Sequence, residues 1–363
     1  MPPTPPTRDL SYEVVRLAGR VALSADRAGR LREVAARVDD WDDVLVVASH
    51  HRTLALVYDH VRDWGPPGLV EPLRAHVQRR TMSVLFLEAE AARIARAMDA
   101  AGVRFLTFKG PALAEAYGGA AHRPYVDNDL LIEPGDFEAA AGVLGELGFQ
   151  WRRRSPVRRA GYLRVHGEYQ FGRATGPLVS TVDLHTRLVP VGYPYNGPFE
   201  ALHRRSRTLT LAGASVPTFA WSDLFLALAV NALKDQWNRL RLATDLAETA
   251  RFVEDWPALV DRAARTRCLR ACHVAVLVST AAVNAEYPAP LVASARADAR
   301  AGRLAQRVLR RLPQAHAEPV MDGAGRLRFT LLAPDGLRGQ LQYLAYVGLR
   351  RVLEPLVEPA VEA

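Results

Sequence analysis

The spacing of the apolar residues changes twice along the chain, and these changes constrain the fold more than any other feature of the sequence. From residue 10 to about residue 100, apolar residues recur at intervals of three and four, as in RLREVAARV and MSVLFLEAEAARIARAM. This interval places them on one face of a helix. From residue 102 short β-rich runs alternate with helical segments, and after about residue 198 the helical interval returns. The sequence therefore predicts an α+β core between two helical regions.

These changes also suggest where the parts of the chain meet. We expect an N-terminal helical region over residues 1–100, a core over residues 101–197 and a mainly helical domain over residues 198–363. Within the last part, residues 208–219 read as a brief β-like patch and residues 318–336 as a turn-rich segment.

The basic charge gives little support to a nucleic-acid partner. The formal net charge is +8 and the pI is about 9.8. However, 45 of the 47 basic residues are arginines, a bias typical of GC-rich coding, so their number overstates functional basicity. No secretory signal and no uncharged apolar run of about 18 residues is visible, and we expect a cytoplasmic protein without membrane contact. The two cysteines, Cys268 and Cys272, cannot form a disulfide framework or a four-thiolate zinc site.

Two aspartates open the apolar run DNDLLIE. Because side chains alternate faces along a strand, Asp127 and Asp129 share one face and Asn128 lies on the other. Two adjacent carboxylates repel unless a cation neutralises them, and hard oxygen ligands suit Mg²⁺ or Mn²⁺. A pair of solvated acids at a strand end is the alternative, and on this motif alone it is favoured.

A second polar strand lies about fifty residues further along, in STVDLHTRL. Asp183 and His185 alternate there with apolar residues, so both side chains occupy one face. A third carboxylate on a neighbouring strand would complete a site for two metal ions that promotes phosphoryl transfer. An ordinary amphipathic strand with a solvent-facing Asp and His remains possible.

Lys109 and Gly110 lie between the strand VRFLTF and the helix that follows. Free backbone N–H groups and a lysine at such a turn suit phosphate oxygens. Lys109 is one of only two lysines in the chain, the other being Lys234. A plain surface turn is the alternative for this segment.

Taken together, these motifs resemble the uncharacterised nucleotidyltransferase family of the DNA polymerase β-like superfamily. The resemblance covers roughly residues 50–251, and its motif positions are Lys109, Gly110, Tyr117, Arg123, Pro124, Asp127, Asp129, Asp183 and His185. Trp237 and Asp245 also fit, whereas Asn231 and Lys234 stand where the family usually carries histidines. Asn128 replaces an apolar residue on the strand face opposite the acids.

The resemblance implies a short mixed sheet flanked by helices and a metal-dependent, two-ion transfer of a nucleoside monophosphate from an NTP. Asp127, Asp129 and Asp183 would be the catalytic, metal-binding residues, with Mg²⁺ or Mn²⁺ as cofactor. Lys109 and Gly110 would steady the triphosphate. Arg123 would neutralise charge on the α-phosphate or the pyrophosphate, unless it forms a surface salt bridge. His185 would orient Asp183 or accept a proton from the acceptor.

The function predicted is therefore transfer of a nucleotide to a small-molecule or peptide acceptor, with a protein partner left open. The sequence does not distinguish transfer of AMP from that of CMP, UMP or GMP. One alternative is a catalytically inactive nucleotide-binding or regulatory, antitoxin-like module. Another is an enzyme that acts on nucleic acid, which would need a continuous positive groove. A third is a protein that neutralises a toxin by tagging a partner.

Overall fold

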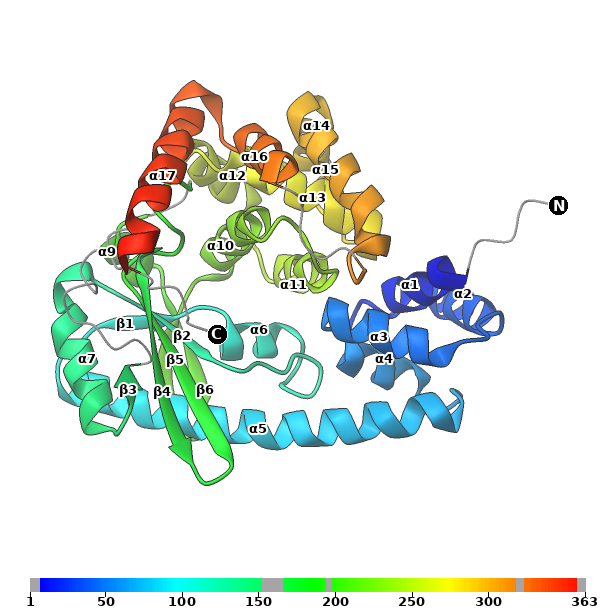
Figure 1. Ribbon diagram of the computed structural model, residues 1–363, viewed down its shortest axis with the longest axis horizontal. Helices are drawn as coiled ribbons and strands as arrows, with labels where there is room; N and C mark the ends of the chain where they lie inside the picture. Colours follow the sequence, from blue (N-terminus) through cyan, green and yellow to red (C-terminus); the bar gives the residue numbers. More distant parts are fainter. Residues whose placement is uncertain (1–6, 152–165, 194–196, 318–322, 358–363) are drawn as a thin grey trace.

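The structure is a computed structural model that describes residues 7–151, 166–193, 197–317 and 323–357. Its first part is helical, as the apolar spacing predicts. The helices are α1 (Thr7–Leu17), α2 (Ala25–Ala35), α3 (Trp41–His51), α4 (Leu54–Val61) and α5 (Pro67–Ala100). Figure 1 shows α5 extending from the N-terminal helices along the whole length of the sheet. Because α5 packs on α3 and α4 and also on β5, β6 and β7, it joins the N-terminal helices to the core.

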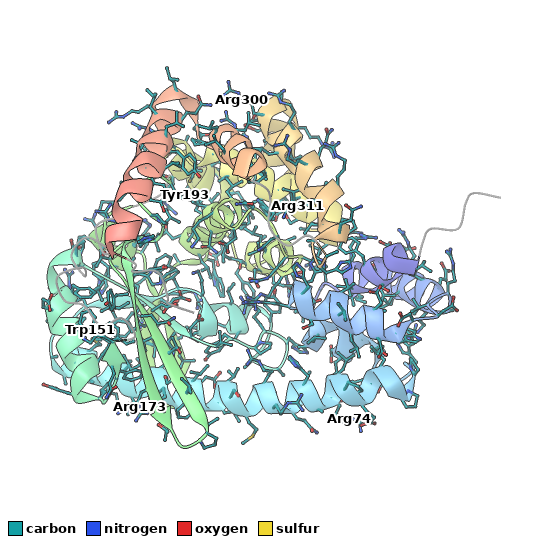
Figure 2. The ribbon with its side chains drawn as sticks, in the orientation of Figure 1. Arg74, Trp151, Arg173, Tyr193, Arg300 and Arg311 are labelled. Carbon is teal, nitrogen blue, oxygen red and sulfur yellow. The ribbon has the colours of Figure 1, made fainter. Side chains whose placement is uncertain are left out.

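The core is a seven-stranded mixed sheet in the order β3-β4-β5-β2-β1-β7-β6. Its strands are β1 (Phe105–Thr107), β2 (Asn128–Ile132), β3 (Gln150–Trp151), β4 (Glu168–Thr175), β5 (Leu178–His185), β6 (Arg207–Leu211) and β7 (Ala214–Thr218). Two neighbouring pairs are parallel, β2 with β5 and β1 with β7, and the other pairs are antiparallel. At one edge, Trp151 packs against Tyr169 and Phe171 of β4 (Figure 2).

Strand β2 lies near the middle of this sheet, and all of its residues are buried. The alternation of faces predicted for DNDLLIE is confirmed on one side, because the amide of Asn128 donates to the carbonyl oxygen of Leu87 in α5, at 3.4 Å. Asp129 therefore points away from α5, toward the opposite face of the sheet. Two short helices in the connections, α6 (Gly110–Ala116) and α7 (Phe137–Glu146), complete the core.

The short helix α9 (Phe199–Arg204) lies between β5 and β6, and after β7 the chain returns to helices. They are α10 (Trp221–Lys234), α11 (Arg241–Ala250), α12 (Trp256–Arg265), α13 (Leu269–Val283), α14 (Ala289–Ala297), α15 (Ala299–Arg311), α16 (Gly323–Leu332) and α17 (Gly336–Val357). In Figure 1 they form a group above the sheet, and α11 packs against both α10 and α6. The contact with α6 brings the C-terminal helices next to the turn that contains Lys109 and Gly110. None of the described helices combines the length and the apolar character that a bilayer span requires.

The predicted fold class is confirmed: a mixed sheet is flanked by helices from both ends of the chain. The β-like patch at residues 208–219 is the β6–β7 hairpin, which joins the same sheet through β1. The sheet thus extends past residue 197, and the domain boundaries stay a prediction. The expectation of turns over residues 318–336 was wrong where α16 forms, because this segment buries Phe329 completely in the core.

Candidate active site

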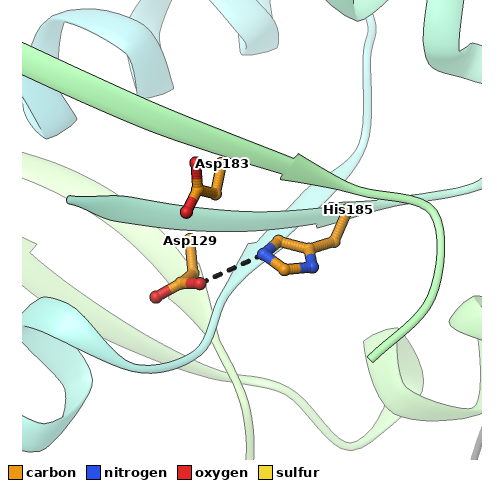
Figure 3. Close-up of side chains that lie close together, drawn as sticks. All are labelled: Asp129, Asp183 and His185. Atoms are coloured by element: carbon orange, nitrogen blue, oxygen red, sulfur yellow. Dashed lines mark hydrogen bonds and ion pairs between the residues drawn. The ribbon is translucent and has the colours of Figure 1, made fainter. Parts of the chain in front are cut away.

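Two acids and a histidine meet where β2 and β5 run side by side. The parallel register sets Asp129 opposite Asp183 and Leu131 opposite His185. Ligand atoms of Asp129, Asp183 and His185 all lie within 4.8 Å of one another (Figure 3). The sequence predicted that these carboxylates belong to neighbouring strands, and the pairing of β2 with β5 brings them together.

Asp129 is held by two partners, the ammonium group of Lys109 and the imidazole ring of His185. Its Oδ1 atom lies 3.3 Å from Lys109 Nζ and 3.1 Å from His185 Nε2. Burial alone would raise the pKa of Asp129, but Lys109 and His185 outweigh it and hold that pKa well below the usual range. Asp129 therefore stays ionised although it is only 4% exposed.

Asp183 and Asp127 lack such strong compensation. Asp183 accepts a hydrogen bond of 2.9 Å from Gln170, its partner across the β4–β5 ladder, yet burial and the nearby charge of Asp129 raise its pKa. Asp127, just before β2, is outside the compact cluster of Asp129, Asp183 and His185 but lines the same cavity. Burial, together with the charges of Asp129 and Asp183, raises the pKa of Asp127 to about 6. The site thus holds excess negative charge.

The turn at Lys109 and Gly110 lies directly against this acidic site. Gly110 has a φ of 27°, and a Cβ atom there would lie 3.1 Å from the carbonyl oxygen of Asp127 and 3.3 Å from the Tyr125 ring. A larger residue would therefore push the turn away from Asp127. Gly110 keeps Lys109 within reach of Asp129.

His185 lies behind the acids. It is 2% exposed, does not line the cavity, and its Nδ1 atom lies 3.5 Å from Glu168. The sequence suggested that His185 orients Asp183, whereas the described hydrogen bond goes to Asp129. The parallel register explains the difference, because it offers His185 a partner on β2 as well as one on its own strand. The direct role in nucleotide binding predicted for His185 stays a prediction.

Arg123 forms a buried ion pair rather than a surface one. Its Nε and Nη2 atoms donate to the two carboxylate oxygens of Asp245 in α11, at 2.7 and 3.0 Å. Tyr117 donates to the same carboxylate at 2.7 Å. Although burial opposes it, the charge of Arg123 lowers the pKa of Asp245. The guanidinium also lines the cavity, so its predicted contact with the nucleotide stays a prediction.

A cavity of about 520 Å³ extends from the acids to the N-terminal helices. Asn231, Lys234 and Asp235 of α10 and its C-terminus line it, which places the two residues that replace family histidines at the site. Sequence reasoning missed several of the lining residues, among them four arginines. These are Arg52, Arg80, Arg239 and Arg241, called the arginine wall below. Among 45 arginines, no signal in the sequence could have singled them out.

The family of the chain follows from comparison with family models. Residues 38–284 match the model of a family described as an uncharacterised nucleotidyltransferase. The chain belongs to this family. A search of the curated proteins finds no match for this chain. Among solved structures, it is similar to a crystal structure of an antigenic nucleotidyltransferase-like protein from Paracoccidioides brasiliensis. The identity is 15%, over 57% of this chain and 95% of that chain, with a TM-score of 0.34.

The acidic cluster of this nucleotidyltransferase family member fits a divalent cation. Asp129 and Asp183 supply the hard carboxylate oxygens that Mg²⁺ and Mn²⁺ prefer. Asp127 adds a third carboxylate to the same cavity. Carboxylates that raise one another's pKa are less costly to bury when a cation lies between them. We conclude that these side chains could hold a metal ion.

Proposed function

We propose that the chain is a metal-dependent nucleotidyltransferase that moves a nucleoside monophosphate from an NTP to a small-molecule or peptide acceptor. One observation carries the proposal: Asp129 and Asp183 lie opposite each other on parallel strands, and Asp127 lines the same cavity. Membership of the nucleotidyltransferase family supports it. ATP is one candidate donor among the four NTPs.

In the proposed reaction, an oxygen or nitrogen atom of the acceptor forms a bond to the α-phosphorus. The bond from that phosphorus to the α,β-bridging oxygen breaks, and pyrophosphate leaves with the electron pair. Asp183 takes the proton that the acceptor loses. Mg²⁺ or Mn²⁺ bound to the carboxylates would neutralise the phosphates and lower the pKa of the attacking group.

The other residues orient and neutralise. Lys109 contacts Asp129 from the cavity side and is placed to steady the triphosphate. His185 and Lys109 fix the carboxylate of Asp129, so this ligand is ionised and oriented in advance. The buried pair of Arg123 and Asp245 holds α11 against the core and so closes the cavity on that side.

A nucleic-acid acceptor is less well supported. The labelled arginines Arg74, Arg173 and Arg300 lie far apart in Figure 2, and none of the three lines the cavity. A nucleic acid would need a continuous basic groove. We therefore favour a small acceptor that fits the cavity of about 520 Å³.

The test is transfer of label from each α-labelled NTP, with Mg²⁺ and a cell extract that supplies the acceptor. The wild type should transfer label from at least one NTP, and Asp127→Ala and Asp183→Asn should reduce transfer by at least about 100-fold. Asp63→Asn is the matched control, because Asp63 is 85% exposed and outside the cavity lining. If the wild type binds an NTP but transfers no more label than Asp127→Ala, the chain is a binding module and the proposal fails.

A further inference from the structure

The cavity has two ends of different charge. Seven arginine and lysine side chains and six carboxylates line it in all. At the first end, the charges that act most on Lys109 are those of the acids Asp129, Glu168, Asp235 and Asp127. The second end is the arginine wall, defined above. There, the charges that act most on Arg241 are those of Arg123, Asp245 and Arg52. A group bound at the wall is therefore in a different electrostatic environment from one bound at Lys109.

The arginine wall has no close ion pair within the described ranges: none of its four side chains lies within 4.0 Å of a carboxylate oxygen there. Asp245 and Asp127 act on Arg241 and Arg52 only from a greater distance, and the buried Nε atom of Arg241 has no hydrogen-bond partner. By contrast, Arg123 pairs with Asp245 and Arg20 pairs with Glu248. The wall thus gathers cations from the C-cap of α3, from α5 and from the N-terminal end of α11 without a close acid partner among the described residues.

Keeping these cations close together costs free energy. Burial and the charges of Arg123 and Arg52 together lower the pKa of Arg241 to about 9, although the charge of Asp245 opposes them. Burial, together with Arg239 and Arg123, also lowers the pKa of Arg52. Partly buried cations that repel one another are stabilised by a bound anion, and the planar guanidinium matches the oxygens of a phosphate group. His76 lines the same end and can add a donor.

Building on the proposed function, we propose that the arginine wall binds a phosphate group of the acceptor, so that the second substrate is a phosphorylated small molecule. The triphosphate of the NTP is assigned to Lys109 and the acids, at the other end of the cavity. A phosphate dianion compensates four cations better than a single carboxylate does. The cavity then holds the donor and the acceptor side by side, each with its own charged end.

Inorganic phosphate is the probe, measured by calorimetric titration of the full chain. Phosphate should bind with and without a saturating non-hydrolysable NTP analogue and Mg²⁺, with dissociation constants that agree within about 3-fold. Arg52→Gln and Arg241→Gln should each weaken phosphate binding by about 10-fold or more and change the affinity for the analogue by less than about 3-fold. Arg265→Gln is the control, since Arg265 is 66% exposed and far from the cavity lining.

Three outcomes would overturn the inference. Phosphate that competes with the analogue, or wall variants that weaken the analogue instead, would assign the wall to the phosphates of the nucleotide. Absence of phosphate binding to a folded wild type would remove the subsite altogether. The variants Arg52→Gln and Arg241→Gln are tested separately, so that the test survives if one of them fails to fold. Circular dichroism checks that each variant is folded. Because the titration needs no turnover, phosphate binding without nucleotide transfer would count against the proposed function and not against the subsite.

Discussion

Two clusters of buried charge lie within the same cavity wall, and they are built in opposite ways. In the ion-pair cluster of Tyr117, Arg123 and Asp245, both oxygens of the carboxylate are hydrogen-bonded and one charge cancels the other. In the acid cluster of Asp127, Asp129 and Asp183, Asp129 has the close cation Lys109 and a hydrogen bond with His185, whereas burial and the neighbouring acids raise the pKa of Asp127. The first cluster stabilises the contact between the core and α11, and the second stores repulsion that a bound cation would relieve. A structural role and a functional role thus leave different electrostatic patterns in one cavity.

The largest effect should come from breaking the ion-pair cluster. Asp245→Asn leaves the guanidinium of Arg123, a residue that is 6% exposed, without a carboxylate. We expect the free energy of unfolding to fall by about 3 to 5 kcal/mol, because an unpaired buried charge remains. Urea unfolding followed by circular dichroism measures the loss.

Two further variants sharpen this prediction. Asp63→Asn should change the free energy of unfolding by less than about 0.5 kcal/mol, because Asp63 is exposed. The double variant Arg123→Met with Asp245→Leu should recover much of the stability lost in Asp245→Asn, because no charge is then left unpaired. A loss below about 1 kcal/mol in Asp245→Asn would show that the two clusters do not differ as described.

Removing an acid from the acid cluster should affect metal binding and leave the fold intact. Asp183→Asn takes one carboxylate from the group of ligand atoms that lie within 4.8 Å of one another. We expect the affinity for Mn²⁺ to fall by at least about 10-fold, with no loss of stability in the metal-free protein. Electron paramagnetic resonance of free Mn²⁺ measures the affinity, and Asp63→Asn should bind Mn²⁺ as the wild type does. An unchanged Mn²⁺ affinity would mean that the acids do not form a cation site.

The smallest predicted effect tests the repulsion among the carboxylates of the acid cluster. Because the pKa of Asp127 is raised to about 6 in the folded chain, ionising this group at pH 7 costs stability. Asp127→Asn should therefore make the metal-free protein more stable at pH 7, by about 1 to 2 kcal/mol.

The raised pKa of Asp127 also predicts how its contribution to stability changes with pH. The folded protein retains the proton of Asp127 in a range where the unfolded chain has lost it, so the contribution of Asp127 to stability falls as the pH rises from about 4 to about 7. Below about pH 4 both states are protonated, and the advantage of Asp127→Asn should vanish. Thermal unfolding in the absence of divalent ions, from pH 4 to pH 7.5, follows this change. A stability difference that does not vary with pH would contradict it.

Much of the site could be predicted from the sequence because local rules fix it. The alternation of side chains along a strand requires Asp127 and Asp129 to share a face, and Asn128 indeed donates to α5 on the other side. The runs FLT and NDLLI are rich in apolar and β-branched residues, which indicates strands, and both runs form strands. The sequence also indicated the β6–β7 hairpin as a β-like patch, but nothing in its residues predicted that β7 would pair with β1.

The partner of Arg123 could not be predicted in the same way. Asp245 lies more than 120 residues away and is brought to Arg123 only when α11 packs on α6. The arginine wall is a similar case, since its members come from the C-cap of α3, from α5 and from the N-terminal end of α11. Contacts between distant segments depend on how whole helices pack, and single residue types carry little information about that packing.

The sequence alone determined the family, the alternation of helical and β-rich segments, and the residues that carry the candidate chemistry. It did so because strand alternation, helical spacing and motif spacing act over a few residues. Only the tertiary structure decided which charges are neutralised. It pairs Arg123 with Asp245 and brings His185 into contact with Asp129. Among the described residues, the arginine wall has no carboxylate within ion-pair distance. Electrostatic pairing depends on distances of a few ångströms between segments far apart in the chain, and folding alone sets those distances.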